Sequence, residues 1–131
     1  MQIRPELTPE NTGLWTGGAK GELRITFCDA CNHAIHPPEL TCPVCLGRET
    51  TPRAVTGNGT IYSFTINRQK WAPDMVVPFA LAVVDLDDVP GVRITAKLVD
   101  VDVDAVKIGD PVEVLFEQNG DVWIPQFRPR V

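Results

Sequence analysis

Apolar and polar residues alternate over five short segments in the second half of the chain, a pattern typical of β-strands. The five segments are Thr60–Ile66, Val77–Leu86, Val92–Val99, Val112–Phe116 and Val122–Ile124. Turn-forming residues separate neighbouring segments: Pro90-Gly91 follows the second, and Asn119-Gly120 lies between the last two. The pattern therefore predicts a small antiparallel structure of five strands.

The spacing of these strands limits the folds that they can form. Residues 100–109, between the third and fourth strands, leave room for one helical turn. Five strands with a short helical segment at that point form the layout of an OB-fold, which is a partly open Greek-key barrel. We expect such a barrel over residues 55–131.

The first 54 residues follow a different pattern. A Thr-Pro pair opens Thr8–Trp15, which predicts a helical turn or short helix with Leu14 and Trp15 as apolar anchors. Leu23, Ile25 and Phe27 then alternate with polar residues as a strand does, and Ala34–His36 returns along it. The fold class is therefore mainly β, with a short N-terminal helix and a ribbon before the barrel.

All four cysteines lie in two Cys-x-x-Cys pairs, Cys28/Cys31 and Cys42/Cys45. This spacing is typical of a four-thiolate Zn²⁺ site, because each pair places two sulfurs on one side of the ion. Four thiolates leave no open position for water or substrate, so one structural Zn²⁺ is expected in residues 1–54. Two disulfides are the alternative; the polar amino terminus lacks the pattern of an export signal, so we expect reduced thiols in the cytoplasm.

Length, charge and hydropathy disfavour several classes of protein. A chain of 131 residues can form one modest core with a metal-held appendage. The formal net charge of −5 disfavours attraction to nucleic acid or to anionic membranes. The longest apolar run, Met75–Val84, contains Pro78 and is far shorter than the roughly 20 residues of a membrane-spanning helix, so a soluble protein is expected.

Several motifs, taken in order along the chain, resemble the DUF35 family. They are Gly21–Leu23, the two cysteine pairs with Pro37-Pro38 between them, Gly59–Thr65, Pro78–Val84 and Ile108–Val112. The resemblance covers nearly the whole chain. It implies a rubredoxin-like zinc ribbon joined to an OB-fold.

The same resemblance implies a function beside enzymes that process acyl-CoA thioesters. Members of the family are partners of thiolase-like proteins, including sterol-carrier-type thiolases, steroid side-chain aldolases and archaeal acetoacetyl-CoA assemblies. The chain would then be an accessory subunit, arranged as a heterotetramer around a thiolase-like dimer, and some members help to bind coenzyme A. Some members are also fused to a hydratase-like domain.

The residue inventory independently favours a non-catalytic role. Ser63 is the only serine and Tyr62 the only tyrosine, while His33 and His36 both fall in the ribbon. No nucleophile therefore has an obvious base beside it. Three carboxylates lie close together in sequence, at the end of the second predicted strand and before its turn: Asp85, Asp87 and Asp88. Solvation at a strand end is their simplest interpretation.

One loop combines basic and aromatic residues. Arg68, Lys70 and Trp71 follow the first barrel strand, and OB-folds often bind ligands through their loops. Contact with the phosphates and adenine of coenzyme A, or with a partner chain, is one interpretation; a solvated loop anchored by a tryptophan is the other. The same two interpretations apply to three further cations: Arg93, Lys97 and Arg128.

Two other functions remain open from the sequence. Zinc ribbons and OB-folds both bind single-stranded nucleic acid in other proteins, although the negative charge and the few aromatic residues on the barrel strands disfavour that use here. An independent acyl-CoA lyase or hydrolase would turn over substrate without a partner.

Overall fold

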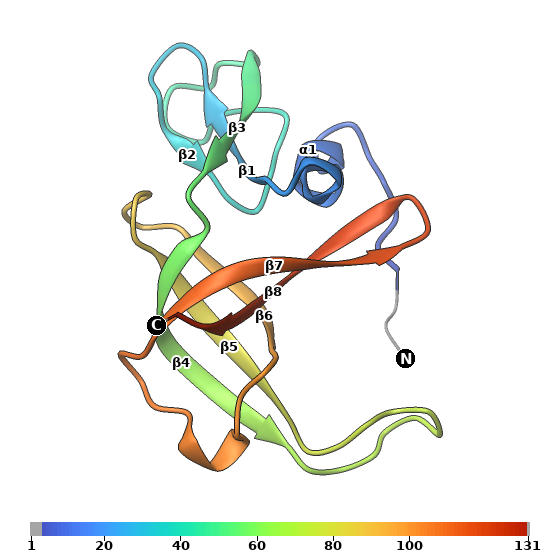
Figure 1. Cartoon of the computed structure of the whole chain (residues 1–131). Helices are drawn as coiled ribbons and strands as arrows, with labels where there is room; N and C mark the ends of the chain where they lie inside the picture. The colour runs from blue at the N-terminus through green and yellow to red at the C-terminus, as the bar shows by residue number, and fades with distance from the viewer. Residues whose placement is uncertain (1–3, 131) are drawn as a thin grey trace.

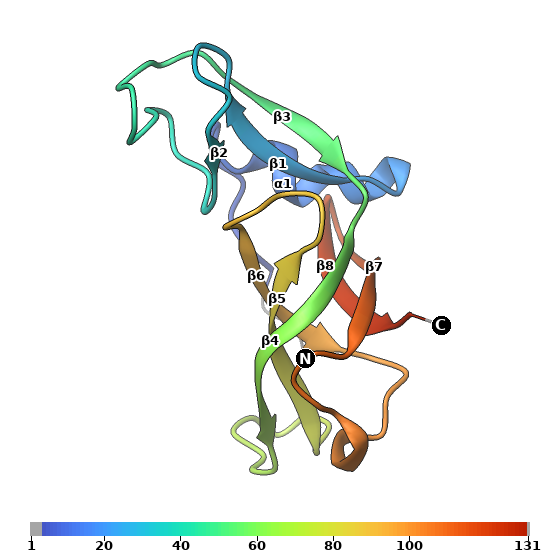
Figure 2. The same ribbon diagram turned by 90° about the vertical axis from the view of Figure 1, so that its left-hand side faces the viewer.

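The computed structural model describes residues 4–130, which form a three-stranded sheet and a five-stranded barrel (Figures 1 and 2). The three-stranded sheet has the order β2-β1-β3 and the barrel the order β4-β5-β6-β8-β7. The mainly β class, the N-terminal helix and the OB-fold barrel are thus confirmed. The elements are α1 (Thr12–Thr16), the 3-10 helix η1 (Gly17–Lys20), β1 (Leu23–Cys28), β2 (Ala34–Ile35), β3 (Thr50–Val55), β4 (Asn58–Asn67), β5 (Phe79–Leu86), β6 (Arg93–Leu98), the 3-10 helix η2 (Val103–Ala105), β7 (Pro111–Asn119) and β8 (Val122–Pro129).

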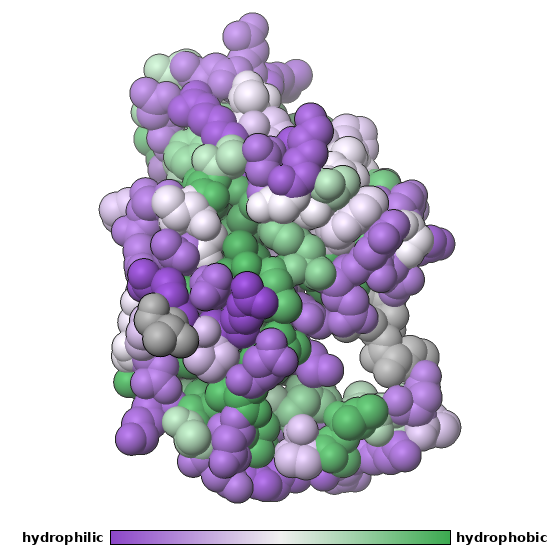
Figure 3. Space-filling model, in the orientation of Figure 1, coloured by the Kyte–Doolittle hydropathy of each residue, from purple (hydrophilic) through white to green (hydrophobic). Residues whose placement is uncertain are grey.

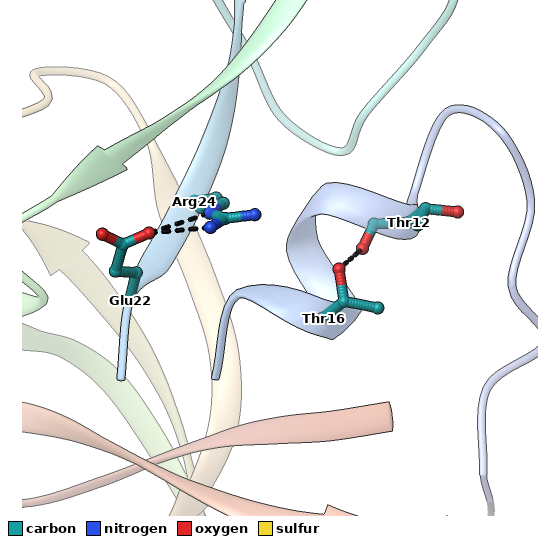
Figure 4. Close-up of polar contacts among 4 residues, drawn as sticks. All are labelled: Thr12, Thr16, Glu22 and Arg24. Carbon is teal, nitrogen blue, oxygen red and sulfur yellow. Dashed lines mark hydrogen bonds and ion pairs between the residues drawn. The ribbon is translucent and has the colours of Figure 1, made fainter. Parts of the chain in front are cut away.

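The helix α1 begins at Thr12, four residues later than predicted. The backbone N–H of Thr8 donates to Asn11 Oδ1 at 2.7 Å, which holds the preceding residues in a turn instead of a helix. Within α1, the Thr16 hydroxyl donates to the Thr12 carbonyl at 2.6 Å (Figure 4). Figure 4 also shows Glu22 and Arg24 at the start of β1, where the guanidinium donates twice to Glu22 Oε1.

The N-terminal segment packs directly on the β7–β8 hairpin. A Cβ atom at Gly18 would lie 2.4 Å from Trp123 Cβ and 2.7 Å from Phe116, so only glycine permits this approach of backbone to side chain. Leu14, Leu23 and Ile25 belong to the same buried cluster as the barrel interior. Ribbon and barrel therefore share one hydrophobic core.

The strand β3 was not predicted from the sequence. It pairs with the whole of β1, from Cys28 opposite Thr50 to Leu23 opposite Val55. Most of its side chains are exposed and Pro52 lies within it, so it has no apolar periodicity. Its backbone bonds to β1, and not burial of its side chains, keep it extended.

The barrel strands agree with the predicted segments at their centres and differ at their ends. β5 begins at Phe79, two residues later than expected, while β8 extends five residues beyond Ile124. Gly120, with φ of +65°, opens a two-residue turn between β7 and β8, as the Asn-Gly sequence predicted. The expected helical turn after β6 is η2, which Asp102 caps by accepting the backbone N–H of Asp104.

A single bridge closes the barrel. β6 pairs with β8 only at Leu98 opposite Phe127, and the backbone N–H of Val99 donates to the Phe127 carbonyl at 2.8 Å. The rest of β6 has β5 as its only ladder partner among the described residues. Over residues 4–130, no helix has the length and hydropathy needed to cross a membrane.

Candidate metal centre and interaction surfaces

Two turns of the same backbone geometry carry the four cysteines. In the first, Asn32 donates its backbone N–H to the Cys28 carbonyl at 2.8 Å, and the Cys28 N–H donates to the carbonyl of His33. In the second, Leu46 donates to Cys42 at 2.9 Å, and the Cys42 N–H donates to Gly47. Asn32 and Leu46 both have positive φ, which turns each loop back on itself.

The four sulfur atoms of Cys28, Cys31, Cys42 and Cys45 converge to within 4.8 Å of one another. Across the two turns, the Sγ atoms of Cys28 and Cys45 are 3.5 Å apart and those of Cys31 and Cys42 are 3.7 Å apart. Four sulfurs around one Zn²⁺ at about 2.3 Å would be separated by about 3.8 Å. The cysteines are free thiols, too far apart for disulfides, and the donor set fits a tetrahedral metal ion.

The crowding of four thiols limits how many can ionise without a cation. The backbone N–H of Cys31 lowers the pKa of the Cys28 thiol to about 7, while burial acts in the opposite direction. For Cys31, the backbone N–H of His33 lowers the pKa, but burial and the neighbouring thiols of Cys28 and Cys42 raise it to about 12. Four simultaneous thiolates therefore require a compensating positive charge, which a divalent ion supplies.

The three carboxylates at the end of β5 and in the turn to β6 form structural contacts. Asp85 accepts from Arg93 Nε at 2.7 Å, and Asp88 accepts the backbone N–H of Thr56 at 3.0 Å. Asp87 accepts from the Thr60 hydroxyl and lies 3.2 Å from Arg130 Nη2. These contacts fix the turn between β5 and β6 to its neighbours.

The structure separates the predicted binding residues into two groups. Arg68, Lys70 and Trp71 lie in the β4–β5 loop, near the end where Asn67 pairs with Phe79. Arg93 lies at the opposite end of the sheet, opposite Asp85. Only the first three therefore belong to one loop surface.

The β4–β5 loop exposes apolar side chains. Trp71 is 71% exposed and Val76 is 76% exposed, and Figure 3 shows an apolar patch at the lower right, over this loop. Trp71 Nε1 donates to Asn67 Oδ1 at 3.1 Å, and Arg68 forms an ion pair with Asp104 at 3.0 Å. The indole is thus held in place while its ring faces solvent.

A groove of about 890 Å³ lies between the N-terminal segment and strands β5 and β6, and Ile124 and Pro125 of β8 also line it. One wall contains Trp15 together with His36 and Pro37, which follow β2; the other contains Phe79 and the five consecutive residues Arg93–Lys97. Burial lowers the pKa of His36, which favours its neutral form. No sequence pattern predicted this groove, because its walls come from distant parts of the chain.

Comparisons with known proteins agree with this geometry. Residues 15–51 match the ChsH2 rubredoxin-like zinc ribbon domain, and residues 52–117 match the ChsH2 C-terminal OB-fold domain. A DUF35 domain-containing scaffold protein of Methanothermobacter thermautotrophicus is 31% identical over 93 residues, which are 70% of this chain and 68% of that protein. The chain belongs to the DUF35 family. The resemblance noted in the sequence is thereby confirmed.

Two further similarities connect this DUF35 chain to a chain of an aldolase and to a hydratase subunit. A chain of the solved Ltp2-ChsH2(DUF35) aldolase superposes with a TM-score of 0.88 and 29% identity, covering 98% of this chain and 100% of that one. A probable enoyl-CoA hydratase alpha subunit of Thermomonospora curvata is 30% identical over 132 residues, covering 100% of this chain. The DUF35 chain spans only 41% of the length of that curated relative.

Proposed function

We propose that the chain is a zinc-bound accessory subunit that docks on a thiolase-like or aldolase enzyme acting on acyl-CoA thioesters. The observation that carries this proposal is the similarity, over 98% of the chain, to a DUF35 chain of an aldolase. The hydratase subunit among its relatives also acts, by its name, on an enoyl-CoA. The catalytic residues would belong to the partner, consistent with the structural engagement of the carboxylates described above.

The zinc ion has a stiffening role in this proposal. Cys28, Cys31, Cys42 and Cys45 would hold one Zn²⁺ in a closed shell, which supplies folding energy and no chemistry. The ribbon then keeps a fixed orientation to the barrel through the shared core. A rigid accessory surface can order the substrate channel of an enzyme and so lower its barrier by placement alone.

Co-expression with the thiolase-like chain encoded nearest to this gene tests the accessory role. We expect a complex whose mass fits a heterotetramer, about one zinc per DUF35 chain, and cleavage of an acyl-CoA substrate only when both chains are present. Light scattering after size-exclusion chromatography and a coupled thioester assay measure these outcomes. Turnover by the isolated chain, or recovery of nucleic acid in place of the enzyme, would contradict the proposal.

We further propose that the β4–β5 loop contacts the coenzyme A portion of the substrate. Lys70 supplies a cation and Trp71 an exposed ring held by Asn67, which suit a phosphate and an adenine. Arg68 is paired with Asp104 and contributes less charge. Arg93, at the far end of the sheet, belongs to a different surface.

Replacing Trp71 by alanine in the assembled complex is expected to raise KM for the acyl-CoA about tenfold and to leave kcat and the complex mass unchanged. Steady-state kinetics measure the change. Val76→Ala, an exposed apolar residue of the same loop, is the matched control and should leave KM unchanged. An unaltered KM in the Trp71 variant would remove the loop from the coenzyme A site.

A further inference from the structure

Within residues 4–130, the groove beside the barrel is bordered by an edge of β6 that has no strand partner before Leu98. β6 pairs with β5 along its whole length, but on its other side it meets β8 only at Leu98. The five preceding residues, Arg93–Lys97, all line the groove. Side chains on a strand alternate between faces, so a run of consecutive lining residues means that the backbone edge itself borders the groove.

The pattern of backbone hydrogen bonds between β5 and β6 shows which groups of β6 lie on that edge. Leu86 donates its N–H to the Val92 carbonyl at 3.1 Å. Bonded and non-bonded pairs alternate along an antiparallel ladder, so the backbone groups of Ile94, two residues further along β6, also point toward β5. The N–H and C=O groups of Arg93 and Thr95 therefore point into the groove. Within residues 4–130, neither has a strand partner on that side.

Cations and apolar surfaces surround this edge. Arg93 lies over the ring of Tyr62 at 3.8 Å, and Lys97 lies over the ring of Phe79 at 5.4 Å. Arg93 is already paired with Asp85, whereas no carboxylate lies within ion-pair distance of Lys97 in the part of the chain described. The opposite wall is mainly apolar, with Trp15 and Pro37, and carries one carboxylate, Glu10.

We propose that an extended acidic segment of the enzyme partner adds to β6 as a further strand. This inference rests on the proposed accessory function and assigns the surface that performs it. Alternating N–H and C=O groups match a peptide backbone, as in β-strand addition at other open sheet edges. A carboxylate of the segment faces Lys97, and an apolar side chain packs against Trp15. At about 3.3 Å per residue, the edge from Arg93 to Lys97 accommodates about five residues.

The edge also favours a peptide over single-stranded nucleic acid. Nucleic acid would require a basic groove with stacking rings free on their faces. Of the Trp and Phe rings that line the groove, that of Phe79 is covered by Lys97, which leaves Trp15 alone for stacking. Within residues 4–130, the groove therefore offers an open backbone edge and the Lys97 cation, with Glu10 as the carboxylate in its lining.

Two matched pairs of variants test the proposal in the co-expressed complex. Thr95→Pro removes the N–H on the open edge without breaking a bond to β5, while Thr95→Val keeps that N–H. Lys97→Glu reverses the free cation, while Lys107→Glu makes the same change at an exposed lysine outside the groove. We expect Thr95→Pro and Lys97→Glu each to weaken binding of the thiolase-like chain by about tenfold or more, and the two controls to leave the Kd unchanged.

Hydrogen exchange on the unmodified complex identifies the occupant. The amides of Arg93 and Thr95 should become protected on binding, whereas that of Ile94, bonded to β5, should change little. The protected stretch of the partner should be short and contain Asp or Glu. Zinc content and melting temperature of each variant verify that it is folded.

The outcomes separate the two proposals. If the complex forms but Thr95→Pro binds normally, or the Thr95 amide stays unprotected, strand addition at β6 is wrong and the accessory function stands. If Thr95→Pro instead disrupts self-association, the occupant is a second copy and the proposal is equally wrong. If the unmodified chain binds no thiolase-like enzyme, both proposals fail together.

Discussion

Replacement of Cys28 by serine is expected to release the metal, unfold the ribbon and abolish binding to the enzyme partner. Structural zinc sites contribute about 10–16 kcal/mol of apparent binding energy in isolated zinc-finger peptides, so loss of one thiolate removes most of the ribbon's stability. Metal quantification, circular dichroism and a pull-down of the partner measure the three effects. This is the largest change that we expect from a single substitution.

The unfolding caused by Cys28→Ser should extend beyond the first cysteine turn. Cys28 is fully buried at the end of β1, and the same strand carries Leu23 and Ile25 into the core shared with the barrel. Loss of order in β1 therefore weakens the packing of the barrel as well.

His33→Ala is the matched control for the cysteine variant. His33 is an exposed residue of the same turn, and only its backbone carbonyl is bonded to Cys28. The alanine variant should keep its zinc and its partner. A zinc-free Cys28→Ser protein that still binds the enzyme with normal affinity would separate the metal from the interface.

The sequence predicted those parts of the fold that bury one face of each element. Alternation in Leu23–Phe27 and in the five barrel segments reflects that burial, and the spacing of the cysteines reflects the ligand geometry of the metal. The strand β3 was not predicted because most of its side chains are exposed. The end of β8 was not predicted because Pro125 and Pro129 interrupt the pattern. In both cases the backbone pairing, which has no sequence signature, decides the structure.

The candidate surfaces were less predictable than the metal site. Four cysteines close together in sequence can be assigned to one centre from their spacing alone. The groove joins α1, the loop after β2, and strands β5, β6 and β8, so only the folded chain brings its residues together. The unpaired edge of β6 depends on the single bridge at Leu98 and Phe127, which no local pattern specifies.

Phe127 is the residue whose truncation should damage the barrel most. Its side chain is 0% exposed, the bulkiest among the fully buried residues, and its backbone forms the bridge that joins β6 to β8. Phe127→Ala leaves a cavity at this closure and is expected to cost about 3–5 kcal/mol of unfolding free energy. Thermal unfolding should show a melting temperature lower by about 10 °C or more.

Two other variants distinguish loss of barrel packing from loss of an exposed ring and from loss of the metal. Trp71→Ala removes a larger but exposed ring and should change stability by less than about 0.5 kcal/mol. Phe127→Ala should keep its zinc, since Cys28, Cys42 and Ile35 form a separate buried cluster, whereas Cys28→Ser should lose it. A Phe127 variant that melts within about 2 °C of the unmodified protein would mean that the phenyl ring adds little to the closure, and that the backbone bridge to β6 maintains it without the ring.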